Sequence, residues 1–145
     1  MKEYKHTQIG YLLLILYSGV ILLIAYLALM SGFNPIALVA LLVMLVVLAL
    51  FATLSVTVDQ EMIKLQFGIG LIRKGFRVDQ IEAYQVVKNP WYYGWGIRYT
   101  PRGWLFNVSG LSALELQMKN GKTYRIGTDD PQGFAQAVEQ ALNHF

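Results

Sequence analysis

The chain has 145 residues, no cysteine and a formal net charge of +3. The lack of cysteine excludes a disulfide framework and cysteine-based zinc sites. The small, dispersed charge argues against nucleic-acid binding, which concentrates basic residues in one patch. Residues 9–54 carry no charged side chain, whereas residues 55–145 carry eighteen. We therefore expect a membrane-embedded N-terminal part and one small water-soluble domain.

Two apolar stretches, residues 9–30 and 35–54, are each long enough to cross a bilayer as a helix. About 20 residues at about 1.5 Å each span a hydrocarbon core of about 30 Å. Only residues 31–34 separate the stretches, so residues 1–54 are predicted to form a cytoplasmic N-terminus and a two-helix transmembrane hairpin. A cleaved signal peptide fits poorly, because the first stretch exceeds a signal core of roughly 7–15 residues.

Basic residues lie on the same side of both predicted spans. Lys2 and Lys5 precede the first span, and Lys64 follows the second within about 20 residues. Both termini are therefore expected to face the cytoplasm. Neither span contains Asp, Glu, Lys, Arg or His, the usual markers of a transport pathway. The helices are expected to be anchors, and the sequence leaves the oligomeric state open.

Apolar and polar side chains alternate over much of residues 55–145, which is typical of half-buried strands. The Asn120-Gly121 dipeptide predicts a tight hairpin. The strands are expected at residues 55–58, 63–67, 71–78, 83–88, 103–108, 113–119 and 122–127.

A helix is predicted at the C-terminal end. Asp130 is suited to the N-cap, Pro131 to the first helical position, and an apolar stripe runs from Phe134 to Leu142. The expected fold is α+β: a curved antiparallel sheet or partly open barrel of about six to seven strands, capped by this helix. A generic α+β sheet with a packed helix is the alternative.

Four stretches carry a resemblance to a known family: residues 67–74, residues 78–81, the aromatic stretch 89–104, and residues 124–131. On these residues the chain resembles bacterial membrane proteins with a pleckstrin-homology-like (PH-like) domain behind a two-helix anchor, most of them of unknown function. The resemblance implies a PH-like fold for residues 55–145 and a location in the bacterial inner membrane. It also implies a scaffold that binds lipids, peptides or proteins, and no particular activity.

Aromatic and basic side chains are concentrated between Pro90 and Arg102. Three interpretations are open: rings that cover an open end of the barrel, a contact with the lipid headgroups, or a docking patch for a partner protein. The candidate interaction patch consists of Trp91, Tyr92, Tyr93, Trp95, Arg98, Tyr99 and Arg102.

A second candidate is a basic strand. Arg73 and Arg77 share one face of the expected strand, and Lys74 lies on the other. The shared face could meet anionic lipid at about 1 kcal/mol per basic residue. Alternatively, these residues solvate an exposed strand and discourage edge pairing.

The sequence predicts no catalytic, cofactor-binding or metal-binding set. His6 and His144 lie at opposite ends of the chain, and a carboxylate-dependent enzyme using Glu82 or Glu115 is a remote alternative. We expect a non-enzymatic, membrane-anchored module that binds a partner protein or the inner leaflet. An accessory subunit that stabilises a larger membrane complex through its helices is the alternative from another class.

Overall fold

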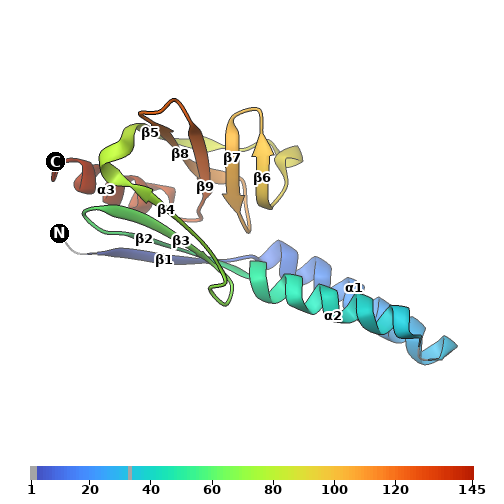
Figure 1. Ribbon diagram of the computed structural model, residues 1–145. Helices are drawn as coiled ribbons and strands as arrows, with labels where there is room; N and C mark the ends of the chain where they lie inside the picture. Colours follow the sequence, from blue (N-terminus) through green and yellow to red (C-terminus); the bar gives the residue numbers. More distant parts are fainter. Residues whose placement is uncertain (1–2, 33) are drawn as a thin grey trace.

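The computed structural model describes residues 3–32 and 34–145, which form an α+β protein with nine strands in two sheets (Figure 1). In chain order the elements are β1 (Tyr4–Ile9), α1 (Tyr11–Ser31), α2 (Pro35–Phe51), β2 (Thr53–Val58), β3 (Met62–Phe67), β4 (Ile72–Arg77), the 3-10 turn η1 (Val78–Gln80), β5 (Ile81–Lys88), the 3-10 turn η2 (Trp91–Tyr93), β6 (Gly96–Thr100), β7 (Gly103–Asn107), β8 (Ser112–Met118), β9 (Thr123–Gly127) and α3 (Pro131–Leu142).

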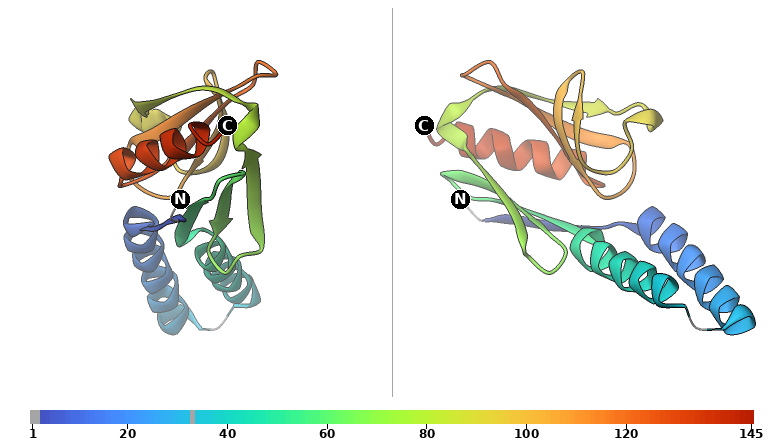
Figure 2. Two further views of the ribbon diagram at one scale, coloured as in Figure 1. Left: turned by 90° about the vertical axis from the view of Figure 1, so that its left-hand side faces the viewer. Right: turned by 45° about the vertical axis from the view of Figure 1, so that its right-hand side comes forward.

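The two apolar helices are inserted into a β-hairpin. β1 pairs antiparallel with β2, from Tyr4 opposite Val58 to Ile9 opposite Thr53. α1 and α2 connect these two strands in the chain, lie side by side and project beyond the end of the sheet (Figures 1 and 2). Only Gly10 separates β1 from α1, and only Ala52 separates α2 from β2. The Gly10 N–H donates to the Ala52 carbonyl at 2.7 Å. The helix pair is therefore joined to the sheet at two points without a long linker.

The helix bounds differ from the predicted spans. Within the described residues, α1 is the helix that is long and apolar enough to cross a membrane, whereas α2 is a shorter apolar helix of 17 residues. α2 stops at Phe51 because the chain then enters β2, where the Leu54 side chain is fully buried. Ile9 likewise belongs to β1. The predicted pair of full-length spans is thus reduced to one helix of spanning length and a shorter companion.

The predicted division at residue 54/55 does not follow the sheet either. β1 comes from the region assigned to the N-terminus and anchor, yet it completes the first sheet. Tyr4 reaches the C-terminal helix, where its hydroxyl donates to Asp130 at 3.0 Å and its ring stacks on Phe134. The water-soluble domain therefore includes the residues that precede the helices.

One apolar core lies between the sheets and α3. Apolar side chains alternate inward along β2 and β3, as period-2 geometry requires. They meet inward-facing residues of β7, β8 and β9, and α3 packs against β2, β5 and β8. The largest fully buried side chains include Phe67, Leu65, Leu114, Ile126 and Phe134.

The α+β class and the C-terminal helix agree with the prediction, which was a curved antiparallel sheet or partly open barrel of about six to seven strands; the number and pairing of the strands differ from it. The described residues form a first sheet in the order β1-β2-β3-β4 and a second in the order β5-β8-β9-β7-β6. β7 runs parallel to β9, and β6 lies in a stretch where no strand was predicted. Periodicity identifies strands but not their partners, so neither the second sheet nor the parallel pair could be read from it.

Candidate functional site

Part of the aromatic stretch has a structural role. β5 and β6 occupy opposite edges of the second sheet, so residues 89–95 must cross from one edge to the other. Both ends of the crossing are held by hydrogen bonds. The Asn89 N–H donates to the Leu111 carbonyl at 2.7 Å, and the Trp95 indole donates to the Gly110 carbonyl at 3.0 Å. The Trp95 side chain therefore helps to hold the end of the crossing segment in place.

Trp91 and Tyr92 are different, because the crossing leaves them in solvent. Their exposed fractions are 74% and 68%, whereas Tyr93 is half-buried. The three rings meet edge to face, with centroids 5.9 Å apart for Trp91–Tyr92 and 5.3 Å for Tyr92–Tyr93. The segment that carries η2 projects from the domain at the end from which α1 and α2 leave (Figures 1 and 2). We call Trp91 and Tyr92 the η2 pair.

The rest of the predicted patch lies along β6 and the turn that follows it. The Arg98 Nε donates to the Trp95 carbonyl at 2.7 Å. Tyr99 packs edge to face on Trp104, its partner on β7, with centroids 5.3 Å apart. These two rings line a hollow of about 500 Å3 together with Arg102 and Lys122. The β6–β7 turn points away from the helices (Figures 1 and 2).

The structure therefore divides the predicted patch in two. The η2 pair lies on the side of the helices, and the Tyr99–Trp104 pair with Arg102 lies on the other side. Trp104 was missed because β6 was not predicted. Trp104 could have been identified from its position opposite Tyr99, but the two residues are opposite each other only when β6 pairs with β7.

The two arginines of the predicted basic strand are both exposed on β4, but their surroundings differ. Arg77 is bound to Asp79 at 2.7 Å. Arg73 lines a hollow of about 350 Å3 on the outer face of the first sheet, which Lys5 and Lys64 also line. Lys64 is paired with Asp59 at 2.9 Å. Lys5 was not predicted to belong to this basic surface, because β1 was not predicted as a strand.

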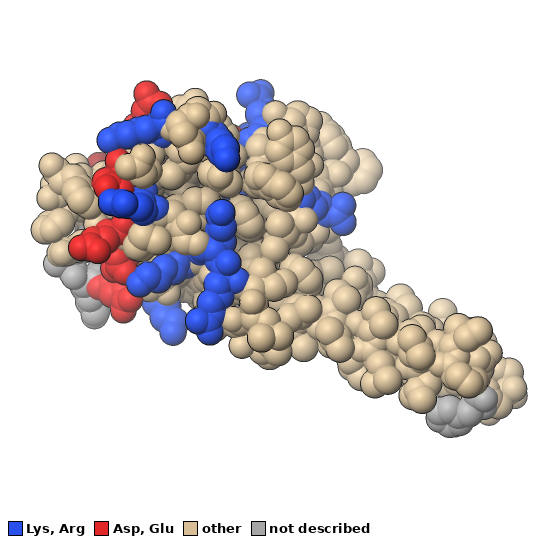
Figure 3. Space-filling view, viewed as in Figure 1, with Lys and Arg blue, Asp and Glu red and all other residues tan. Residues whose placement is uncertain are grey.

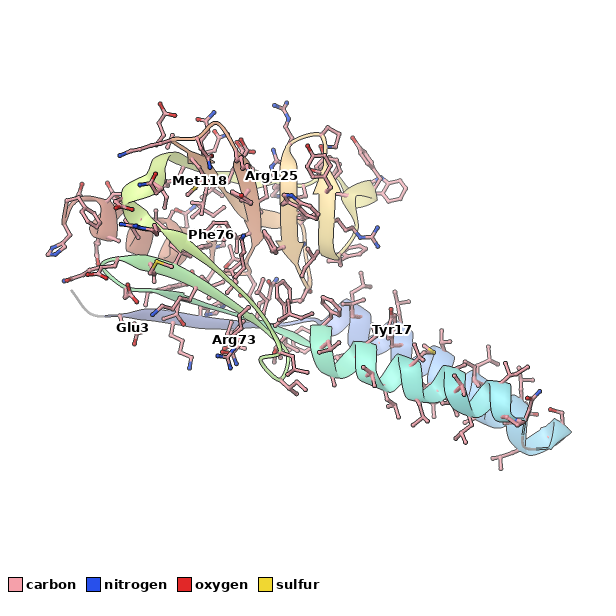
Figure 4. All side chains as sticks on the ribbon, viewed as in Figure 1. Glu3, Tyr17, Arg73, Phe76, Met118 and Arg125 are labelled. Carbon is pink, nitrogen blue, oxygen red and sulfur yellow. The ribbon has the colours of Figure 1, made fainter. Side chains whose placement is uncertain are left out.

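Charge is unevenly distributed on the face seen in Figure 3. Lys and Arg side chains extend over the middle of the domain, whereas Asp and Glu gather at the end away from the helices. The helices carry no charged side chain. Figure 4 shows the same gradient at single residues: Arg73 lies toward the helices, and Glu3 lies at the far end of the first sheet. The side of the domain near the helices is therefore apolar to basic.

The two carboxylates considered for catalysis have ordinary structural surroundings. Glu82 is exposed on β5. Glu115 accepts hydrogen bonds from Arg125 at 2.8 Å and Gln85 at 2.9 Å. Burial acts to raise the pKa of Glu115, but these hydrogen bonds and the Arg125 charge outweigh it and lower the pKa. Glu115 is thus held ionised as the partner of a nearly buried arginine.

Arg125 also donates to Asn89 Oδ1 at 3.0 Å, so the ion pair holds the start of the crossing segment in place. Among the described residues, no three His, Asp or Glu side chains lie close enough to hold a metal ion.

No protein-family model matches the chain, and no curated protein matches it significantly. The resemblance to PH-like membrane proteins stays a prediction from the residues.

Proposed function

We propose that the protein is a non-enzymatic, membrane-anchored module whose domain rests on the lipid headgroups of the inner leaflet through the η2 pair. The observation that carries the proposal is the position of Trp91 and Tyr92: exposed, on the side of the domain from which both helices leave. Trp and Tyr concentrate at membrane–water interfaces because the ring is apolar and one edge is polar. A PH-like scaffold, suggested by the sequence, is compatible with such a role.

Both helices are proposed to cross the bilayer. At about 1.5 Å per residue, the 17 residues of α2 extend about 26 Å. This length is at the lower end of the spanning range, and a mismatch of a few Å costs only fractions of a kcal/mol per Å. Leu, Ile and Val side chains on both helices are largely exposed. Such a continuous apolar surface far exceeds the few hundred Å2 that water-soluble monomers expose.

The tight connections support a fixed orientation of the domain. Gly10 and Ala52 each form a one-residue link, and a hydrogen bond joins them. The domain can therefore turn little relative to the helices, which keeps the η2 pair at the membrane side. Arg98, exposed on β6, and Arg73 add charge that favours an anionic surface by about 1 kcal/mol each when near it.

The test is fluorescence quenching of the full-length protein in nanodiscs whose lipids are brominated near the top of the acyl chain. Bromine quenches only tryptophans that reach the interface. We expect partial quenching of the native protein, a smaller quenched fraction in Trp91→Phe, and a larger one in Trp104→Phe, which removes an unquenched emitter. Equal quenching in both variants would contradict the proposal and would assign Trp91 to another surface.

A second candidate function is the docking of a partner protein at the Tyr99–Trp104 pair. The specific observation is an exposed aromatic pair beside two basic residues, on the side away from the helices. Tyr, Trp and Arg dominate the energies of protein interfaces. A photo-crosslinking amino acid at Tyr99 should then capture one discrete protein in membranes, and the same group at Lys119 should not.

A further inference from the structure

We propose that the turn between β3 and β4, residues 68–71, is an additional membrane-contact element that places Ile69 and Leu71 in the bilayer interface beside α2. This inference rests on the proposed function, because it requires α2 to be embedded in the bilayer. It adds a contact that neither the helices nor the η2 pair provide.

The turn is seated against the end of α2. The Gly68 N–H donates to the Thr53 carbonyl at 2.9 Å, just beyond the helix. Gly68 has φ +52°, and a Cβ at this position would overlap the carbonyl oxygens of Ala49 and Leu50 in the last turn of α2. Only glycine permits so close an approach of two backbones. The turn therefore lies at the same depth as the last turn of α2.

The tip of this turn carries aliphatic side chains where turns ordinarily carry polar ones. Ile69 and Leu71 are 67% and 75% exposed. Within residues 53–145, all of which are described, they are the two most exposed large aliphatic side chains, and the next, Val86 and Leu111, are at 41%. Two large aliphatic side chains left in water at the end of a membrane helix are explained if the bilayer covers them.

A basic residue follows at the right distance. Arg73 lies two residues beyond Leu71 on β4, so its backbone lies about 7 Å farther from the tip. The headgroup layer on each side of the hydrocarbon core is about 5–7 Å thick. When Ile69 and Leu71 reach the acyl boundary, the Arg73 backbone therefore lies in the outer part of the headgroup layer. The Arg73 Nε donates to the Gly70 carbonyl at 2.7 Å, so the side chain runs back toward the turn, and the guanidinium lies within the headgroup layer where its Nη groups can meet phosphate oxygens.

The experiment uses the absence of cysteine in the natural sequence. Single-cysteine variants of the full chain, Ile69→Cys, Val43→Cys and Asn120→Cys, are labelled with an environment-sensitive fluorophore in nanodiscs of mixed neutral and anionic lipids. Each is quenched in turn by spin-labelled lipid and by a water-soluble quencher. Val43 reports on α2, and Asn120, at the tip of the β8–β9 hairpin, is the matched turn control.

We expect the label at position 69 to show blue-shifted emission and to lose most of its intensity to the lipid-borne quencher. The label at position 120 should lose intensity only to the soluble quencher. If position 43 is quenched by lipid and position 69 only from water, the inference is overturned while the anchor stands. If both quenchers fail at position 69, protein covers the turn and the inference is again overturned. If position 43 is not quenched by lipid, the proposed function fails and the inference fails with it.

Discussion

Replacing Gly68 by alanine tests whether the domain and the end of α2 are in contact through the backbone. Two costs arise at this position. An L-residue in the left-handed region costs about 1–2 kcal/mol, and φ at Gly68 is +52°. The new Cβ also overlaps the Ala49 and Leu50 carbonyl oxygens, and overpacking of this kind costs typically 1–3 kcal/mol more. We expect the free energy of unfolding to fall by about 2–5 kcal/mol in Gly68→Ala.

Gly121→Ala is the matched control, because Gly121 also has a positive φ, of +86°, but nothing lies within 4 Å of an added Cβ. This variant should lose only about 1–2 kcal/mol. The difference of about 1–3 kcal/mol between the variants measures the contact with α2. The assay is denaturant unfolding of the full chain in micelles, followed by tryptophan fluorescence. Equal losses of unfolding free energy in the two variants would show that the turn is not seated on the helix.

Three further predictions concern the domain. The pKa of Glu115 is lowered in the folded state. Its ionisation therefore stabilises the fold above the unfolded carboxyl pKa of about 4.3, and this stability is lost as pH falls through the lower folded pKa. In acid-unfolding measurements, the free energy of unfolding should depend less on pH in this window for Glu115→Gln than for the native chain. Arg125→Met should cost about 3–5 kcal/mol in a urea titration, because it leaves Glu115 poorly solvated and without its charged partner, and a near-native midpoint would contradict this. Residues 10–52 can be replaced by Asn-Gly, which joins the register partners Ile9 and Thr53 in a two-residue hairpin. This variant should be a water-soluble domain with a cooperative melting transition. A 55–145 fragment lacks β1 and the fully buried Leu54, so it should melt without a cooperative transition.

The elements that were predicted correctly are those whose signal is local. The Asn120-Gly121 hairpin is confirmed, with β8 and β9 on either side of it. The C-terminal helix begins at Pro131 with Asp130 as its cap, whose Oδ1 accepts from the Gly133 N–H at 3.2 Å. In each case a few adjacent residues carry the whole preference, so no distant partner is needed to form the element.

The elements that were missed depend on partners far along the chain. β1 is a strand because β2, more than forty residues later, offers it a ladder across the helix pair. β6 forms because β7 folds back on it, although the glycines and the proline around it are typical of a loop. β7 can pair with β9 because β8 lies on the other side of β9, between β9 and β5, which leaves one edge of β9 for β7.

The candidate sites were located in part. Sequence reasoning identified the residues between Pro90 and Arg102 and the arginines of β4. It treated the aromatic group as one patch, whereas the crossing of the second sheet places the η2 segment at the helix end of the domain and the β6–β7 turn points away from the helices. It also missed Lys5, which lines the same hollow as Arg73 only once the first sheet has formed, and Trp104, which lies opposite Tyr99 only when β6 pairs with β7.

The composition and order of neighbouring side chains set which residues avoid water and which local turns and caps form, so these features could be predicted before any strand pairing was known. Packing of the folded chain, by contrast, sets that the helix pair leaves the domain between two strands of one sheet, and that the η2 segment and the β3–β4 turn lie at the same end of the domain as the helices (Figures 1 and 2). The physical reason is that strand partners and the closeness of two backbones, as at Gly68 and α2, are set by packing among segments far apart in the chain.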